Sequence, residues 1–288
     1  MFTPKLIALD LDGTLLSDTG EITPYTKSQI RSAVNRGISV VISSGRPLTG
    51  IPAKEALELG ISYAITTNGA AVYRIADGLC LYENGLSPDL STDILTHLPS
   101  RHQQIDVFIQ GIAYTQASAL HIIDNSLILP KSLKKYIRAT RRQVENITDY
   151  ILEKQATVQK VTMNFEQNPD GTFISRQTTH NYLSSRPEIN VVCGGYMNLE
   201  FTKAGVSKAK GLLFLCNYLG IPVETSMACG DSENDLDILK AAGLSVAMEN
   251  ADHSVKDICD YVTSSCNEDG VGHAIARFAN TSGKEDEN

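Results

Sequence analysis

Residues 6–14 of the chain, Leu-Ile-Ala-Leu-Asp-Leu-Asp-Gly-Thr, decide the fold that the sequence predicts. The four apolar residues, close to the N-terminus, predict a buried strand of a parallel sheet. Ligands bind beyond the carboxyl ends of strands in open α/β sheets, and Asp10 and Asp12 follow this strand directly. Gly13 lets the backbone bend, so both carboxylates can turn towards one point. Two acids at one point can hold a magnesium ion, and one of them can act as a nucleophile.

The segments on either side of a long central insert alternate between strands and helices. We expect strands at residues 6–9, 38–43, 63–66, 71–74, 226–229, 244–247 and 261–263. We expect helices at residues 23–37, 48–59, 208–219 and 234–242, from residue 252 and up to residue 278. This alternation predicts an α/β fold with a doubly wound, mostly parallel sheet and right-handed crossovers.

The middle of the chain breaks this alternation. Residues 86–193 mix helices (89–98 and 131–140) with strands (105–110, 113–116, 158–165 and 189–193). An α+β insert of this length is large enough to be a domain. The expected organisation is therefore a discontinuous core, residues 1–85 and 194–288, with an inserted domain at residues 86–193.

Composition narrows the range of partners and locations. The chain has 288 residues, with 25 basic and 33 acidic side chains and a formal charge of −8, which argues against general nucleic-acid binding. No basic segment leads into an apolar stretch at the N-terminus, and no apolar run approaches the roughly 20 residues that span a membrane. The six cysteines form no CxxC pair, so we interpret them as reduced core thiols. These features predict a cytoplasmic protein without a membrane partner.

Residues 43–47, Ser-Ser-Gly-Arg-Pro, follow the second predicted strand. The hydroxyl of Ser44 and the backbone N–H of Gly45 can donate hydrogen bonds to a phosphoryl oxygen, and the helix start beyond them favours an anion. An ordinary connection from strand to helix is the alternative interpretation. The acidic stretch after the first strand has a similar alternative, because Asp and Gly are common turn residues.

Lys208 stands at the first turn of a predicted helix, where a cation opposes the helix dipole. That position indicates a function, although a solvated surface lysine is a common alternative. Lys203 and Lys210 lie nearby.

Two further signals follow predicted strands. Residues 230–235, Gly-Asp-Ser-Glu-Asn-Asp, start with a glycine that allows a turn, after which Asp231 projects from the strand end. A parallel sheet can bring this strand end beside that of Asp10, although helix capping alone also favours acidic residues here. Asn68-Gly69 is a strong turn signal, and a plain hairpin turn is the favoured interpretation, with Asn68 facing the site as the alternative.

Taken in order, these stretches resemble the four motifs of the haloacid dehalogenase (HAD) superfamily. The Ser-Gly-Arg-Pro, Val-Ser-Lys and Gly-Asp-x-x-Asn-Asp forms look like the Cof-type subfamily. The resemblance extends from about residue 4 to residue 280 and implies a HAD-like Rossmannoid core. The insert at residues 86–193 looks like the C2-type cap of Cof-like sugar phosphatases.

The resemblance also implies roles for individual residues. Asp10 would be the nucleophile, and Asp12 would be the general acid and base. Mg²⁺ would be held by Asp10, Asp231 and Asp12, the last through its backbone carbonyl. The residues implied to bind the phosphoryl group are Ser44, Gly45, Lys208 and Asn234. The supporting residues are Asp235, Asn68 and Arg46.

The function implied is a Mg²⁺-dependent phosphatase that acts on small phosphate esters, with sugar phosphates favoured and the leaving group left open. A phosphomutase that returns the phosphoryl group to a sugar is the alternative within enzymes. A non-catalytic ligand-binding protein on the same scaffold is a weaker alternative, because such proteins are expected to lose Asp10, Asp12 or Asp231, and all three are present. The expected assembly is a monomer or small homo-oligomer that binds a small-molecule ester and no nucleic acid.

Overall fold

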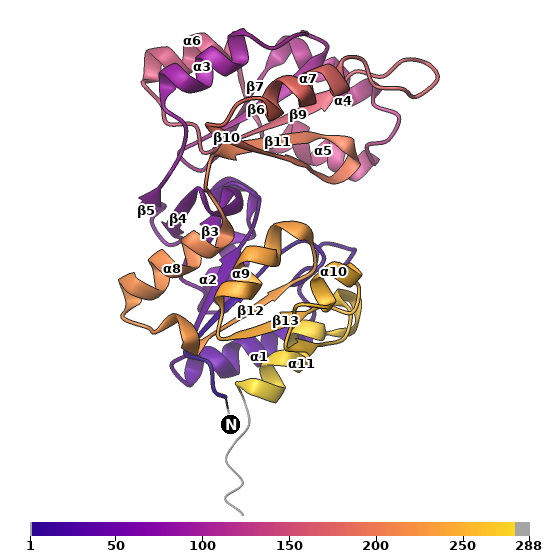
Figure 1. The fold of residues 1–288 in the computed structure, drawn as a ribbon. Coiled ribbons are helices and arrows are strands. Elements are labelled where there is room, and N and C mark those ends of the chain that lie inside the picture. The colour runs from indigo at the N-terminus through magenta and orange to yellow at the C-terminus, as the bar shows by residue number, and fades with distance from the viewer. Residues whose placement is uncertain (1, 280–288) are drawn as a thin grey trace, which may run out of the picture. The chain divides into compact units, whose positions relative to one another are not determined.

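Strand β1 (Leu6–Leu9) lies within an eight-stranded sheet in the computed structural model, which describes residues 2–279. The order of strands is β14-β13-β12-β1-β2-β3-β4-β5. Figure 1 labels β3, β4, β5, β12 and β13 of this sheet. The other strands are β2 (Ser39–Ser43), β3 (Tyr63–Thr66), β4 (Ala71–Arg74), β5 (Leu79–Glu83), β12 (Ser226–Gly230), β13 (Leu244–Ala247) and β14 (Tyr261–Val262). β1 pairs in parallel with both β12 and β2, and all four of its residues are buried. The mostly parallel sheet is the one that the alternation of elements predicts.

Helices cover both faces of this sheet. They are α1 (Pro24–Asn35), α2 (Ala53–Glu58), α8 (Lys208–Leu219), α9 (Leu236–Ala241), α10 (His253–Lys256) and α11 (Gly270–Phe278). α1 leads from β1 to β2, and α9 leads from β12 to β13 in the opposite direction along the sheet. Right-handed crossovers in opposite directions place these two helices on opposite faces. α11 packs against α1, and α8 packs against α9.

Local chemistry sets several of these boundaries. The side chain of Thr23 accepts a hydrogen bond from the backbone N–H of Thr26, and Pro24 occupies the first turn of α1. The helix expected at residues 48–59 is interrupted: a short 3₁₀ turn, Leu48–Gly50, precedes α2. Pro52 lies between them, and its ring and missing N–H prevent a continuous helix.

A second, six-stranded sheet has the order β10-β11-β9-β6-β7-β8. Its strands are β6 (Gln103–Ile109), β7 (Ile112–Gln116), β8 (Arg142–Val144), β9 (Lys160–Phe165), β10 (Ile189–Cys193) and β11 (Leu199–Lys203). The associated helices are α3 (Pro88–Thr96), α4 (Leu120–Asn125), α5 (Lys131–Thr140), α6 (Ile147–Lys154) and α7 (Arg176–Ser184). Residues that alternate along β6 and β9, such as Val107, Val161 and Met163, form its hydrophobic core with α3 and α6.

The chain divides into two compact units around these two sheets. The first unit contains the chain up to Gly45, then Pro52–Tyr82, and the chain from Ser207 onward. The second contains Arg46–Ile51 and Glu83–Val206. The boundary expected between residues 193 and 194 separates β10 from β11, whereas these strands pair with each other along their whole length. The second unit therefore extends 13 residues beyond residue 193, to Val206.

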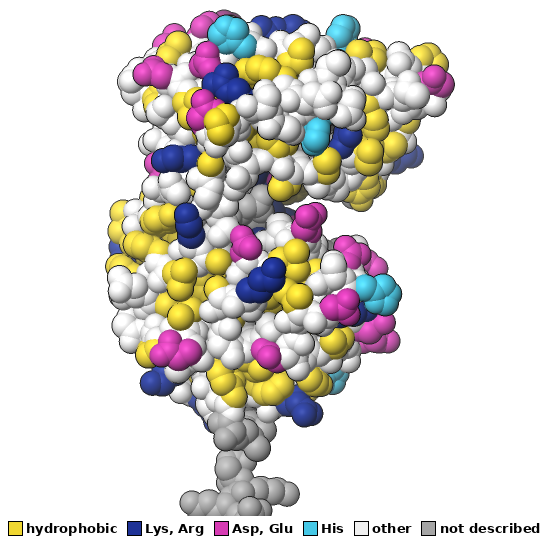
Figure 2. Space-filling view, in the orientation of Figure 1, with side chains coloured by type: hydrophobic (Ala, Val, Ile, Leu, Met, Phe, Trp, Pro, Cys, Tyr) yellow, Lys and Arg dark blue, Asp and Glu magenta, His cyan; other side chains and the backbone are white. Residues whose placement is uncertain are grey.

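The surface and the cysteines show two further features. On the face drawn in Figure 2, Lys and Arg side chains are interspersed with Asp and Glu side chains. All six cysteines are free, but Cys80 and Cys193 are exposed, which corrects the expectation that the thiols lie in the core.

Within residues 2–279, no helix has the length and apolar character needed to cross a membrane.

Candidate active site

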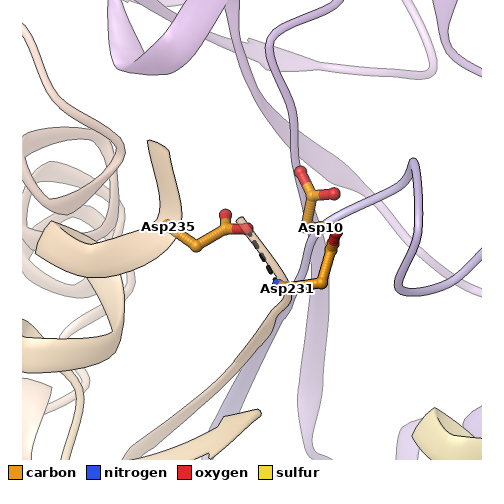
Figure 3. A group of neighbouring side chains, drawn as sticks. All are labelled: Asp10, Asp231 and Asp235. Atoms are coloured by element: carbon orange, nitrogen blue, oxygen red, sulfur yellow. Dashed lines mark hydrogen bonds between the residues drawn. The ribbon is translucent and has the colours of Figure 1, made fainter. Parts of the chain in front are cut away.

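The neighbouring strands β1 and β12 end at two acidic loops. Leu9 pairs with Cys229, and the backbone N–H of Asp10 donates to the Cys229 carbonyl at 3.1 Å. Asp10 and Asp231 therefore leave adjacent strand ends, although they are 221 positions apart in the sequence. Each of Asp10, Asp231 and Asp235 offers a carboxylate oxygen, and these oxygens lie within 4.8 Å of one another (Figure 3). We call these three residues the carboxylate cluster.

The turn after Asp10 packs directly on Asp231. Gly13 has φ +80°, and a Cβ atom at this position would lie 2.5 Å from Oδ2 of Asp231, so only glycine fits. The next residue, Thr14, is buried and its hydroxyl donates to Oδ1 of Asp231 at 2.7 Å. Thr14 is a site residue that sequence reasoning missed, because its partner lies 217 positions away.

Lys208, the first residue of α8, is 1% exposed. Its Nζ lies 2.6 Å from Oδ1 of Asp10 and 2.6 Å from Oδ1 of Asp235. It also donates to Oδ1 of Asn234 at 3.3 Å. The surface interpretation of Lys208 is therefore wrong, and the ammonium group lies inside the carboxylate cluster.

Asp235 supports the loop that carries Asp231. Its Oδ2 accepts hydrogen bonds from the backbone N–H groups of Asp231 (3.1 Å, dashed in Figure 3) and Ser232 (3.2 Å). Its Oδ1 accepts from Lys208. With both oxygens engaged in this way, Asp235 is better suited to orienting Asp231 and Lys208 than to binding a metal directly.

Asn234, Asn68 and Ser44 form a chain of contacts beside the cluster. The side-chain amide of Asn234 donates to Oδ1 of Asn68 at 3.3 Å. The backbone N–H of Asn68 donates to the Ser44 carbonyl at 3.2 Å. Asn68 has φ +58° within a 3₁₀ turn, Thr67–Gly69, and it faces Asn234, which was the alternative to a plain hairpin turn. Gly45 directly follows Ser44 and ends the first stretch of the first unit.

The remaining two expected site residues are not members of the cluster. Asp12 is exposed in the turn after β1, and its carboxylate is not part of the carboxylate cluster. Arg46 packs within the second unit, where its guanidinium donates to the Gly50 carbonyl at 3.0 Å and lies 5.6 Å from the ring centroid of Tyr136. These two contacts of Arg46 lie inside its own unit, and packing on an aromatic ring accounts for the position of the guanidinium there.

Burial and like charges shape the electrostatics of the cluster. Burial raises the pKa of Asp10 well above its usual range, and the charge of Asp235 adds to this effect against the lowering influence of Lys208. Burial also raises the pKa of Asp231 to about 6, while the hydrogen bond from Thr14 opposes the rise. Burial alone would lower the pKa of Lys208, but the charges of Asp10 and Asp235 outweigh it and raise that pKa.

The charges and the pKa shifts of the carboxylate cluster indicate whether it can hold a metal ion. Three carboxylates face one ammonium group, so two negative charges lack a compensating cation when all four groups are ionised. Carboxylate oxygens are the ligands that hard divalent cations prefer, and Asp10 and Asp231 are both available for this role. The donor set and the raised pKa values fit a divalent cation at this site.

Comparison with known proteins establishes the family. Residues 7–275 match the family model for haloacid dehalogenase-like hydrolases. The chain belongs to this family. A 5-amino-6-(5-phospho-D-ribitylamino)uracil phosphatase of Bacillus subtilis is 32% identical over 275 residues, which cover 95% of each chain. Phosphatase YwpJ of the same organism is 29% identical, over 94% of this chain and 98% of its own length.

Solved structures agree with this assignment. A haloacid dehalogenase-like hydrolase from B. subtilis has a TM-score of 0.78 and 27% identity, and the match covers 94% of this chain and 98% of that one. A HAD subclass IIB sugar phosphatase has a TM-score of 0.75, over 95% of this chain and 98% of that one, at 23% identity, and so supports the fold alone. The predicted family and fold are confirmed, and the protein is a phosphoric monoester hydrolase of the HAD superfamily.

Proposed function

We propose that the protein is a Mg²⁺-dependent phosphatase that hydrolyses small phosphate esters through a phosphorylated Asp10. The observation that carries the proposal is the buried ammonium group of Lys208, 2.6 Å from both Asp10 and Asp235. Phosphoryl transfer depends mostly on positioning and on neutralising the charge of the transferring group. A buried cation beside a carboxylate at a strand end supplies both requirements.

In the first step, an oxygen of Asp10 attacks the phosphorus atom and the bond from phosphorus to the ester oxygen breaks. Asp12 gives its proton to the departing alcohol oxygen. In the second step, Asp12 takes a proton from a water molecule, and this water attacks the phosphorus of phospho-Asp10. The bond between phosphorus and the Asp10 oxygen breaks, inorganic phosphate leaves, and Asp10 returns as a carboxylate.

The other residues hold the phosphoryl oxygens. Lys208, the side-chain amide of Asn234, the hydroxyl of Ser44 and the backbone N–H of Gly45 are the donors. Asp10, Asp231 and the Asp12 carbonyl would hold a magnesium ion, which would supply further positive charge to these oxygens when bound. Asp235 and Asn68 orient Lys208 and Asn234, which they contact.

The name of one relative supports a proposal for the substrate class. The similar B. subtilis enzyme acts, by its name, on a phosphorylated ribityl compound, in which the phosphate is esterified to a sugar-alcohol chain. We therefore place sugar and sugar-alcohol phosphates first among the substrates of this chain.

The test is phosphate release from a panel of sugar, sugar-alcohol, nucleotide and cofactor phosphates, with Mg²⁺ and with EDTA. Release that needs Mg²⁺ supports the proposal, and the ester hydrolysed fastest defines the substrate class. Transfer of the phosphoryl group between two positions of a sugar, without release, would instead identify a phosphomutase. No release and no transfer from any ester would contradict the proposed function.

A further inference from the structure

The loop that follows β13, residues 248–252, is fixed to the loop that carries Asp231. The backbone N–H of Met248 donates to the Gly230 carbonyl at 3.1 Å. The backbone N–H of Asp252 donates to the Asp231 carbonyl at 3.4 Å. Two main-chain contacts therefore hold residues 248–252 beside the second acidic loop.

The side chain of Asn250, in the middle of this loop, reaches the first acidic loop. Its Nδ2 donates to the Gly13 carbonyl at 2.8 Å, and its Oδ1 accepts from the backbone N–H of Cys266 at 2.8 Å. One partner is a carbonyl and the other an N–H, so the orientation of the amide group is determined by chemistry. Asn250 thus connects the turn after Asp12 to two other loops of the same unit.

Gly13 lies between the expected acid and base, Asp12, and Thr14, which donates to Asp231. The hydrogen bond from Asn250 to the Gly13 carbonyl fixes the peptide plane that joins Gly13 to Thr14. Gly13 has φ +80°, and few other backbone conformations are open to it while its carbonyl is held. Backbone hydrogen bonds from Thr14 to the Leu11 carbonyl (3.4 Å) and from Leu15 to the Asp10 carbonyl (3.1 Å) also hold this turn. The contact with Asn250 adds a side-chain restraint on the orientation of both Asp12 and Thr14.

We propose that Asn250 is a positioning residue that holds the Asp12–Thr14 turn against the loop of Asp231, so that Asp12 can protonate the leaving group. The inference rests on the proposed function of Asp12. It assigns a catalytic consequence to a residue outside the four motif stretches of the sequence.

The chain supplies a matched control in Asn267. The side chain of Asn267 exchanges two hydrogen bonds with Asp18, at 3.0 and 2.8 Å. Like Asn250, it connects the segment after β1 to the C-terminal part of the chain, but its partner is six residues beyond Asp12. Asn267→Ala therefore removes a similar side-chain link without touching the turn at Gly13.

The experiment compares turnover of p-nitrophenyl phosphate with turnover of the preferred alkyl phosphate in wild type, Asn250→Ala, Asn250→Asp and Asn267→Ala. An alkoxide is a poor leaving group and needs protonation, whereas p-nitrophenolate needs little help. Because Asp12 also acts as base in the second step, which both esters share, the comparison uses kcat/KM, which reports only the steps up to release of the alcohol. For both Asn250 variants we expect kcat/KM for the alkyl ester to fall about 10-fold or more and kcat/KM for the aryl ester to fall about 3-fold or less. Asn267→Ala should leave the ratio of the two rates unchanged.

The proposal would be overturned if the Asn250 variants lost equal activity on both esters, or if both kept unchanged turnover. It would also be overturned if Asn267→Ala lost more activity on the alkyl ester than on the aryl ester. Thermal unfolding of each variant shows whether it is folded. Asn250→Asp keeps the shape of the side chain while presenting an oxygen to the Gly13 carbonyl, so it tests the contact even if Asn250→Ala does not fold. A wild type that hydrolyses neither ester would refute the proposed function itself. That result differs from an active wild type whose Asn250 variants lose equal activity on both esters, which would refute only the role of Asn250.

Discussion

Lys208 neutralises two buried carboxylates, so its removal should affect both stability and turnover. Lys208→Met would leave Asp10 and Asp235 without their shared cation. We expect the free energy of unfolding to fall by about 3 kcal/mol and phosphate release to fall at least about 100-fold. Urea unfolding and steady-state kinetics measure these two effects. Lys210, exposed on the same helix, is the control, and Lys210→Met should change neither quantity appreciably.

Asp231 predicts how stability depends on pH when no metal is bound. Its pKa rises from the ordinary 3.8 to about 6 on folding, so the folded chain holds more protons than the unfolded chain between these values. Its contribution to stability is therefore full below pH 3.8 and is lost as the pH rises to about 6. In EDTA, Asp231→Asn should be more stable than wild type near neutral pH, by about 2 kcal/mol, and less dependent on pH. Urea unfolding across this range is the measurement, and a variant less stable than wild type at neutral pH would contradict it.

At the scale of single residues, the sequence predicts those site residues whose local motif gives a chemical reason for their position. Asp10, Asp231 and Lys208 are found because an acid at a strand end, or a lysine at a helix start, stands out locally. Thr14 and Asn250 do not stand out, since a threonine after a glycine and an asparagine in a loop are common. Their partners lie 217 and 237 positions away, and only the fold brings them together.

The turn at Thr67–Gly69 packs closely on the start of α8, near the cluster. Gly69 has φ +93°, and a Cβ there would lie 2.0 Å from the Ser207 carbonyl oxygen, which cannot move without shifting Lys208. Gly69→Ala should therefore lower stability by more than about 2 kcal/mol and reduce turnover. The control is Gly220, at the other end of α8, which has φ +68° but where a Cβ would meet no atom within 4 Å. Gly220→Ala should cost about 1 kcal/mol and leave turnover unchanged; equal turnover losses in both variants would contradict the argument.

Elements differ in how far the sequence predicts them. Seven of the eight strands of the first sheet are found almost to the residue, because buried strands are short apolar runs bounded by turns. β5 (Leu79–Glu83) was not expected, and its residues are exposed or half-buried. β3 and β13 have the expected bounds. In the insert, β8 and β11 were not expected, since Arg142–Val144 is only three residues long and Leu199–Lys203 alternates apolar with polar residues over a short span. α6 and α7 were also missed. α7 has no side-chain cap at its N-terminus, whereas α6 does carry a local signal, since the side chain of Asn146 caps its first turn.

At the scale of the whole molecule, the chain order predicts the two-part organisation but not its boundaries. An α+β insert interrupts an alternating α/β pattern, and this change of pattern is visible in the sequence. The assignment of Arg46–Ile51 to the second unit is not visible, since these residues follow Gly45 without a break in composition. The backbone N–H of Thr49 donates to the Gly111 carbonyl at 3.0 Å, and this contact across 62 positions shows why local patterns could not reveal it.

The measurement that tests the central claim most directly is turnover by Asp10→Asn, on the preferred ester with saturating Mg²⁺, beside wild type. The substitution keeps the size of the side chain and removes its nucleophilic carboxylate, so the variant should fold and lose at least about 1,000-fold in phosphate release. Circular dichroism and thermal unfolding establish that it is folded. Substantial Mg²⁺-dependent release by the folded variant would contradict the account, because it would exclude Asp10 as the nucleophile.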